Sequence, residues 1–242
     1  MSKPRLTIGI LEAGPVERSF DARYRSQSDF FLACLGPHAP DVGFESYPVY
    51  EGALPPAPQT CDGYLITGSR YSVYDPLPWI APLKDFVKTA AEDRPVVGVC
   101  FGHQLVAEIF GGRVAKSERG WGVGVHRYAV AGTEWWMAPP LQDMSLIVSH
   151  QDQVIEPPPG AAVLGGSPFC PIGMMRIGAN VLSLQPHPEA PRDYCAKLFA
   201  GRRQRIGNGP VDSAIASLAR RTDDDTVARW LLRFLDPAAR KP

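Results

Sequence analysis

The sequence predicts an α/β protein built on a mostly parallel central sheet. Short apolar strands alternate with helical segments through the first half of the chain, and glycine and proline separate the segments. The strand-helix-strand order implies right-handed crossovers, which make the strands parallel in one doubly wound sheet. The 242 residues, 45% of them hydrophobic, suffice for a sizeable core. We therefore expect residues 1–242 to form a single domain.

The first half of the chain supplies the parallel elements in order. Residues 6–11 form a nearly continuous apolar run, as expected of a strand covered on both faces. A helix over 28–35 follows, and residues 43–50 predict an edge strand that Pro48 ends. The remaining elements expected here are a buried strand within 62–69, a helix over 79–92, a strand over 96–99 and a helix that starts near Phe101 and reaches Phe110.

The second half has a different pattern, with short strands separated by turns that indicate a more antiparallel arrangement. The expected strands are 121–130, 146–148, 162–165 and 181–184. The C-terminal helices, about 191–236, are expected to pack on the domain, because the last one has an apolar face formed by Val227, Trp230, Leu231, Phe234 and Leu235. The basic cluster of Arg202, Arg203 and Arg205 is interpreted as complementing the dipole at a helix end rather than as an anion site.

Composition narrows the class of protein. The 25 basic and 25 acidic residues balance, so nothing indicates a nucleic-acid or membrane surface. No apolar run approaches the length of a membrane span, and no signal peptide is expected. The five scattered cysteines include no CxxC pair, which predicts reduced thiols in a cytoplasmic protein without a zinc site. No metal or other cofactor is expected.

Residues 98–102, Gly-Val-Cys-Phe-Gly, lie between the strand at 96–99 and the next helix. This is the cysteine counterpart of the Gly-x-Ser-x-Gly nucleophile elbow, a strained turn that lifts one side chain above the sheet edge. Glycine is expected at both flanks because a Cβ there would crowd the adjacent strand or helix. The pattern therefore predicts Cys100 as a nucleophile, and the alternative is a buried cysteine in a close-packed turn.

A thiol nucleophile needs a base, and the base needs an acceptor for its other ring nitrogen. Residues 185–189, Gln-Pro-His-Pro-Glu, supply both after the strand at 181–184. His187 is the candidate general base and acid, and Glu189 the residue that orients its ring. Taken alone, His187 fits a surface loop histidine better than a catalytic one; together with the elbow and Glu189, the catalytic interpretation is favoured.

The other four histidines are interpreted as wall or structural residues. His103, in the first turn of the elbow helix, is interpreted as a wall residue whose ring could approach the site. His150 follows a strand and could line the same opening. His38 and His126 are interpreted as structural.

These motifs together resemble the class I (triad) glutamine amidotransferases, over roughly residues 5 to 200. The resemblance implies a flavodoxin-like three-layer sandwich and attack of Cys100 on the carboxamide of glutamine, giving a γ-glutamyl thioester and releasing ammonia. It also implies an oxyanion hole formed by two backbone N–H groups, and a substrate pocket. The implied donors are those of Gly68 and Phe101, and the implied pocket residues are Gln104, Ser149, His150 and Gln151. Pro186 replaces the usual phenylalanine before His-Pro-Glu.

Within that family the chain most resembles the stand-alone group called GMP-synthase-like amidotransferases. No nucleotide-binding P-loop or synthetase domain accompanies it in the sequence, so an ammonia acceptor would have to be bound by a separate synthetase partner. The alternatives are a hydrolase of glutamine or other small γ-glutamyl compounds, a glutaminase subunit, and a non-catalytic binding protein on the same fold. Tyr71 and Tyr74, in an aromatic loop, are candidates for a rim that selects the leaving group.

Overall fold

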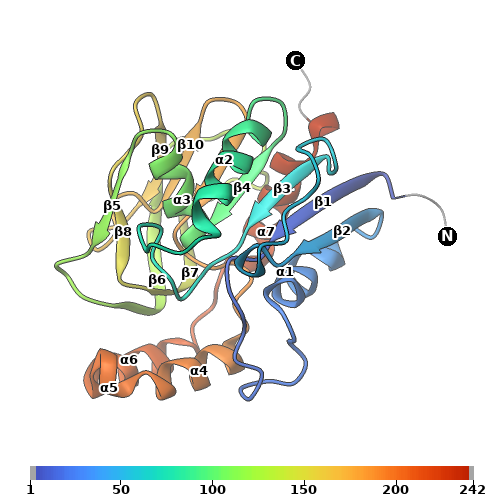
Figure 1. The fold of residues 1–242 in the computed structure, drawn as a ribbon. Helices are drawn as coiled ribbons and strands as arrows, with labels where there is room; N and C mark the ends of the chain where they lie inside the picture. Colours follow the sequence, from blue (N-terminus) through green and yellow to red (C-terminus); the bar gives the residue numbers. More distant parts are fainter. Residues whose placement is uncertain (1–3, 240–242) are drawn as a thin grey trace.

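A nine-stranded sheet runs through the centre of the molecule, with helices on both of its faces (Figure 1). The computed structural model describes residues 4–239. The strand order is β2-β1-β3-β4-β11-β10-β9-β6-β7. The predicted α/β class is therefore confirmed, as is the change in character between the two halves of the chain.

Five neighbouring strands are parallel, and the elbow strand lies among them. They are β2 (Val42–Tyr47), β1 (Leu6–Leu11), β3 (Gly63–Ile66), β4 (Val96–Val99) and β11 (Val181–Leu184). The last three are completely lined by buried residues, because helices cover both faces. β2, ending before Pro48, is the edge strand that the sequence predicts. This order places the carboxyl ends of β3, β4 and β11 side by side.

The other four strands continue the sheet in antiparallel fashion. They are β10 (Met174–Ile177), β9 (Ala162–Gly166), β6 (Gly122–Val130) and β7 (Asp143–His150). A separate antiparallel pair is formed by β5 (Arg113–Lys116) and β8 (Asp152–Glu156). The sequence patterns missed β5, β8 and β10, since these strands have four or five residues and place charged residues among their apolar ones.

Two hydrophobic clusters on opposite faces of the sheet hold the layers together. One face is covered by α2 (Ile80–Ala90) and α3 (Phe101–Ile109), and the other by α1 (Gln27–Leu35) and α7 (Asp224–Leu235) (Figure 1). Trp136 and Trp230 meet edge to face with their ring centroids 5.9 Å apart, and both are fully buried. Full burial of a large apolar side chain contributes about 1.5–3 kcal/mol. Short 3₁₀ turns occupy Gly36–His38, Val49–Glu51 and Pro237–Ala239.

Three further helices lie below the sheet in Figure 1 as a separate layer. They are α4 (Arg192–Gly201), α5 (Arg203–Ile206) and α6 (Asn208–Ser217). α6 packs closely on β6 at Gly124, where φ is +91° and a Cβ would lie 2.5 Å from Ser217 Oγ. Ser217 Oγ also accepts a 2.8 Å hydrogen bond from the Val125 N–H. These contacts fix the helical layer over the carboxyl ends of the strands.

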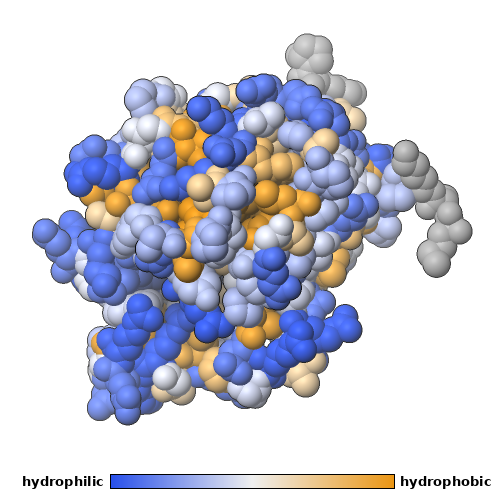
Figure 2. Space-filling view, viewed as in Figure 1, coloured by the Kyte–Doolittle hydropathy of each residue, from blue (hydrophilic) through white to orange (hydrophobic). Residues whose placement is uncertain are grey.

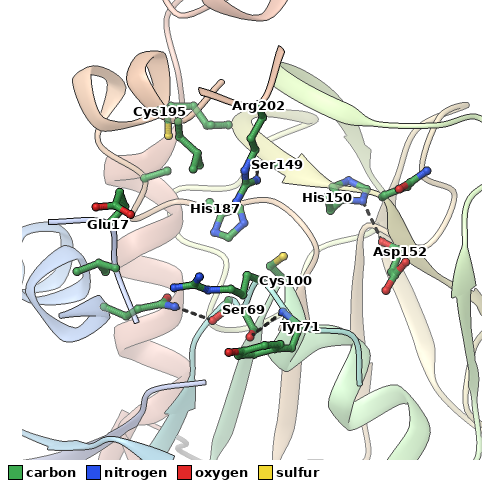
Figure 3. A pocket seen from close by; sticks show the side chains of 18 of the residues that line it. Glu17, Ser69, Tyr71, Cys100, Ser149, His150, Asp152, His187, Cys195 and Arg202 are labelled. Carbon is green, nitrogen blue, oxygen red and sulfur yellow. Dashed lines mark hydrogen bonds between the residues drawn. The ribbon is translucent and has the colours of Figure 1, made fainter. Parts of the chain in front are cut away.

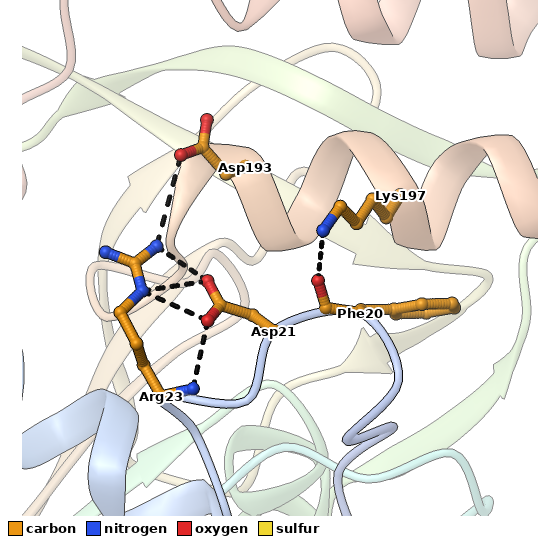
Figure 4. A network of polar contacts seen from close by, with 5 residues as sticks. All are labelled: Phe20, Asp21, Arg23, Asp193 and Lys197. Carbon is orange, nitrogen blue, oxygen red and sulfur yellow. Dashed lines mark hydrogen bonds and ion pairs between the residues drawn. The ribbon is translucent and has the colours of Figure 1, made fainter.

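The loop between β1 and α1 docks on α4 through polar contacts (Figure 4). Arg23 pairs with Asp21 at 2.6 Å, and Asp193 at the start of α4 lies 4.0 Å from the same guanidinium. The Lys197 ammonium donates to the carbonyl oxygen of Phe20. The loop and α4 therefore form one continuous wall.

Hydrophilic side chains cover most of the face shown in Figure 2, including the helical layer. Apolar side chains gather on the upper part of this face, over the region that carries α2 and β3. None of the helices within residues 4–239 is both long and apolar enough to cross a bilayer.

Candidate active site

Cys100 lies at the junction of β4 and α3 with φ +54° and ψ −100°. It is the one non-glycine residue between positions 4 and 239 with a positive φ, and such backbone strain concentrates at functional sites. A Cβ on Gly98 would collide with the carbonyl oxygen of Gly102, and one on Gly102 would lie 2.5 Å from the Ile66 oxygen. Both flanks of the turn therefore require glycine, as the sequence analysis expects.

His187 is brought to Cys100 by the loop after β11. Its N–H donates to the Ile147 oxygen at 2.8 Å, which ties the loop to β7. Its ring Nδ1 lies 2.7 Å from Glu189 Oε1. The ring and the Cys100 side chain both border Gly68, where an added Cβ would lie 2.9 Å from His187 Cε1 and 3.6 Å from Cys100 Cβ. Glu189 is buried, so its charge is weakly screened by solvent. The imidazole and the carboxylate are therefore paired, and both line the same cavity as Cys100.

The electrostatics of this arrangement favour the protonated imidazole. Burial lowers the pKa of His187, but the charge of the hydrogen-bonded Glu189 carboxylate is the main opposing cause, and the pKa lies well above its usual value. A protonated ring beside the Glu189 carboxylate can donate a proton to a leaving amine.

The backbone N–H groups of Gly68 and Phe101, the two donors that the resemblance implies, have no acceptor among the described residues. The peptide that carries the Gly68 N–H is oriented by a 3.2 Å hydrogen bond from the Gly102 N–H to the Thr67 oxygen. Gln27, which the sequence analysis did not single out, donates from Nε2 to the Gly68 oxygen at 2.9 Å. No local pattern marks Gln27, because its partner lies 41 residues away.

A cavity of about 580 Å³ opens above Cys100 (Figure 3). All six residues expected at the pocket or its rim line it: Tyr71, Tyr74, Gln104, Ser149, His150 and Gln151. Gln104 already donates from Nε2 to the Asp152 oxygen at 2.8 Å and to Gln185 Oε1 at 3.0 Å. Only the Gln104 amide oxygen therefore remains for a ligand. Tyr74 lies at the rim of the cavity, and 49% of it is exposed.

The two remaining candidate histidines differ. His150 lines the cavity, and burial lowers its pKa to about 3, so its ring is neutral with Nδ1 3.0 Å from the Asp152 oxygen. The expectation for His103 is wrong, since its side chain is fully buried away from the cavity. Its ring nitrogens lie 2.8 Å from Ser183 Oγ and 3.0 Å from the Ile172 oxygen. Burial lowers the pKa of His103 to about 4.

A family model described as glutamine amidotransferase class-I matches residues 47–193, more than half of the chain. The chain belongs to the class-I glutamine amidotransferase family. Among curated relatives, Gamma-glutamyl peptidase 4 of Arabidopsis thaliana is 30% identical over 178 residues, 70% of each chain. The glutamine amidotransferase-like protein chyE of Penicillium rubens is 29% identical over 205 residues, 82% of this chain and 84% of the relative.

Solved structures of the family share the fold. A glutamine amidotransferase from Thermotoga maritima superposes with a TM-score of 0.72 at 16% identity, covering 97% of each chain. One from Methylobacillus flagellatus gives a TM-score of 0.70 at 22% identity, covering 98% of this chain and 96% of the other. At these identities the likeness establishes the three-layer α/β architecture of the family.

The match to the family model ends at residue 193, before most of the helical layer that closes the cavity. Arg202, at the end of α4, lines the cavity and donates from Nη1 to Ser149 Oγ at 2.9 Å. The interpretation of this side chain as a dipole complement is therefore wrong, because its guanidinium points to β7 rather than to the end of its helix. Sequence spacing could not place it there, since the contact spans 53 residues.

Proposed function

We propose that the protein is a cysteine-dependent hydrolase or amidotransferase that cleaves the γ-amide bond of glutamine or of a γ-glutamyl compound. The observation that carries the proposal is the position of Cys100, held in a strained left-handed turn beside the His187–Glu189 pair at the floor of a cavity. We also propose a cytoplasmic protein, in keeping with five free cysteines.

In the acylation half of the proposed reaction, the Cys100 thiolate attacks the γ-carbonyl carbon. The C–S bond forms, and the carbonyl oxygen becomes an oxyanion that accepts from the N–H groups of Gly68 and Phe101. One such donor stabilises the transition state by about 2.7–4 kcal/mol. His187 gives its proton to the leaving nitrogen, the C–N bond breaks, and ammonia or an amine departs.

In the deacylation half, water attacks the γ-glutamyl thioester and His187 accepts a proton from it. The C–S bond breaks, glutamate leaves, and the thiolate–imidazolium pair is restored. Acid–base help of this kind accelerates a reaction by ~10²–10⁴-fold. Glu189 stabilises the imidazolium in both halves through the 2.7 Å contact between its Oε1 and Nδ1.

Two findings favour a leaving group larger than ammonia. The cavity of about 580 Å³ falls within the range of sites that hold drug-sized ligands, so it has room for more than a glutamine side chain. In addition, relatives named gamma-glutamyl peptidase match this chain. A γ-glutamyl peptide or amine is therefore the substrate that we favour.

The test is hydrolysis by the purified protein of free glutamine and a panel of γ-glutamyl dipeptides and amines, with Cys100→Ala as the blank. We expect turnover of at least one γ-glutamyl compound well above the blank, and stoichiometric labelling of Cys100 by a glutamine-like chloroketone. Labelling without turnover would favour a glutaminase subunit that delivers ammonia to a separate synthetase. Neither labelling nor turnover would indicate a non-catalytic binding protein and overturn the proposal.

A further inference from the structure

Two arginines of the helical layer enter the cavity wall opposite the elbow. Arg202 ends α4, and Arg205 follows three residues later in α5, so both side chains lie on the same helical face. Both line the cavity, and both guanidinium groups lie near the Trp121 ring, at 5.9 Å and 4.7 Å from its centroid. Figure 3 shows Arg202 reaching down toward His187 and Ser149.

Neither guanidinium forms an ion pair with an acidic residue of the part of the chain that the structure describes. The Arg202 guanidinium donates a hydrogen bond to Ser149 Oγ, a neutral acceptor that uses one of its five N–H donors. Arg203, between the two, differs: its guanidinium pairs with Asp212 at 2.6 Å and does not line the cavity. Arg202 and Arg205 are therefore cavity-lining charges without an acidic partner among the described residues, and two further basic residues, Arg70 and Lys116, line the same cavity.

The charge at Arg202 is also in an unfavourable environment. Burial lowers the pKa of Arg202, and the nearby charge of Arg205 lowers the pKa further. A partly buried charge without a counter-ion costs free energy that an anionic ligand would offset.

None of the four carboxylates in the cavity wall, Glu17, Asp75, Asp152 and Glu189, forms an ion pair with Arg202 or Arg205. Each accepts a hydrogen bond from a residue of its own surroundings: Glu17 from Ser19, Asp75 from the Ser72 N–H, Asp152 from the Ser72 hydroxyl, and Glu189 from His187. The cavity lining therefore contains four basic side chains, Arg70, Lys116, Arg202 and Arg205, and no carboxylate of the lining pairs with Arg202 or Arg205.

We infer that Arg202, supported by the charge of Arg205, binds a carboxylate of the γ-glutamyl substrate. The inference rests on the proposed function, since it names how that site would hold its ligand. A guanidinium presents paired N–H groups that fit a carboxylate in bidentate fashion. The carboxylate has two sources, the α-carboxylate of the γ-glutamyl part or the carboxylate of an amino-acid leaving group.

Binding is measured by titration calorimetry in the Cys100→Ala protein, which removes the proposed nucleophile. Three ligands separate the two sources: γ-glutamylalanine, γ-glutamylalaninamide, which lacks the leaving-group carboxylate, and 4-aminobutanoylalanine, which lacks the α-carboxylate. Adding Arg202→Gln should weaken γ-glutamylalanine about ten- to a hundredfold, as expected for a hydrogen bond between charged groups. Arg202→Lys should weaken it less, and Arg203→Gln is the matched control that should leave it unchanged.

The ligand that lacks the contacted carboxylate identifies the source, because for it Arg202→Gln should change nothing. An unchanged affinity for the alaninamide assigns the leaving-group carboxylate, and an unchanged affinity for 4-aminobutanoylalanine assigns the α-carboxylate. Equal weakening of all three ligands would make Arg202 merely structural and overturn the inference. No effect on any ligand, or no binding of any ligand, would overturn it too.

The failure of the proposed function is distinguishable from the failure of this inference. Hydrolysis is measured separately, in the protein that retains Cys100. Carboxylate-dependent binding without hydrolysis would leave Arg202 as a binding residue and reject the enzyme. Hydrolysis without carboxylate-dependent binding would reject the role of Arg202 and leave the proposed enzyme in place.

Discussion

The sheet edge that carries Cys100 and the helical layer α4–α6 that faces it are built on different principles. At the edge, backbone meets backbone: a Cβ at Gly102 would lie 2.5 Å from the Ile66 oxygen, and Cys100 itself has a positive φ. The helical layer instead faces the cavity with side chains, two of which, Arg202 and Arg205, are long and charged. Atoms at the edge have little freedom to move, whereas those side chains have several rotatable bonds each.

The difference indicates how chemistry and selection are divided in the proposed enzyme. Reaction requires reacting atoms to be held within fractions of an ångström, which close-packed backbone provides. Choosing among leaving groups requires a surface that can change without disturbing that geometry. Substitutions at the edge should therefore affect folding and catalysis together, and substitutions in the cavity wall should affect substrate preference alone.

The largest effect is expected for Gly98→Ala. The added methyl group would overlap the carbonyl oxygen of Gly102, so the elbow would have to open. Overpacking of this kind costs about 1–3 kcal/mol or more in the free energy of unfolding, and opening the elbow should also displace Cys100. Urea unfolding and chloroketone labelling of the variant measure the two effects.

The matched control is Gly36→Ala, at a position with φ −54° and no atom within 4 Å of the added Cβ. This substitution should be neutral or stabilise by about 0.4–1 kcal/mol, because alanine restricts the unfolded chain. If the two variants were equally stable and equally labelled, the rigid edge described above would be disproved.

A smaller but more specific effect is expected for Glu189→Gln, which keeps the shape of the side chain and removes its charge. The Glu189 charge helps to raise the pKa of His187, so its removal should lower that pKa. Because the protonated ring is lost as pH rises through its pKa, the alkaline fall in kcat/KM should move to lower pH. The rate at neutral pH should fall on the order of 10²-fold.

The measurement is the pH profile of kcat/KM, supported by NMR titration of the His187 ring. Glu92→Gln, an exposed residue outside the cavity, is the control and should leave the profile unchanged. An alkaline limb at the same pH in Glu189→Gln would mean that the Glu189 charge does not act on His187.

The smallest effect is expected for Tyr74→Ala in the rim. Tyr74 is 49% exposed and lines the cavity, so its loss should change the relative kcat/KM among γ-glutamyl substrates by a few-fold and leave labelling of Cys100 intact. Trp135→Ala is the matched control, since Trp135 is also 49% exposed and lies outside the cavity. Identical preference in both variants would remove Tyr74 from the selecting rim.

Much of the architecture could be predicted from the sequence because it depends on local sterics and burial. The apolar run at 6–11 and the strand at 181–184 were predicted with their observed bounds. The Gly-x-Cys-x-Gly turn was predicted for the same reason, since the need for glycine at both flanks follows from the tight passage of a strand into a helix. β5, β8 and β10 were missed because four or five residues of mixed polarity carry too little periodicity to identify a strand.

By itself, the sequence determined the α/β class, the elbow, and the candidate pairing of Cys100 with His187 and Glu189, because each motif is compact and its spacing already limits its geometry. Only the tertiary structure decided what surrounds them. It buried His103 against Ser183, turned Gln27 onto the Gly68 oxygen, and placed Arg202 in the cavity wall. These contacts join residues 41 to 80 positions apart. They depend on how the sheet and helices pack, which local periodicity does not encode.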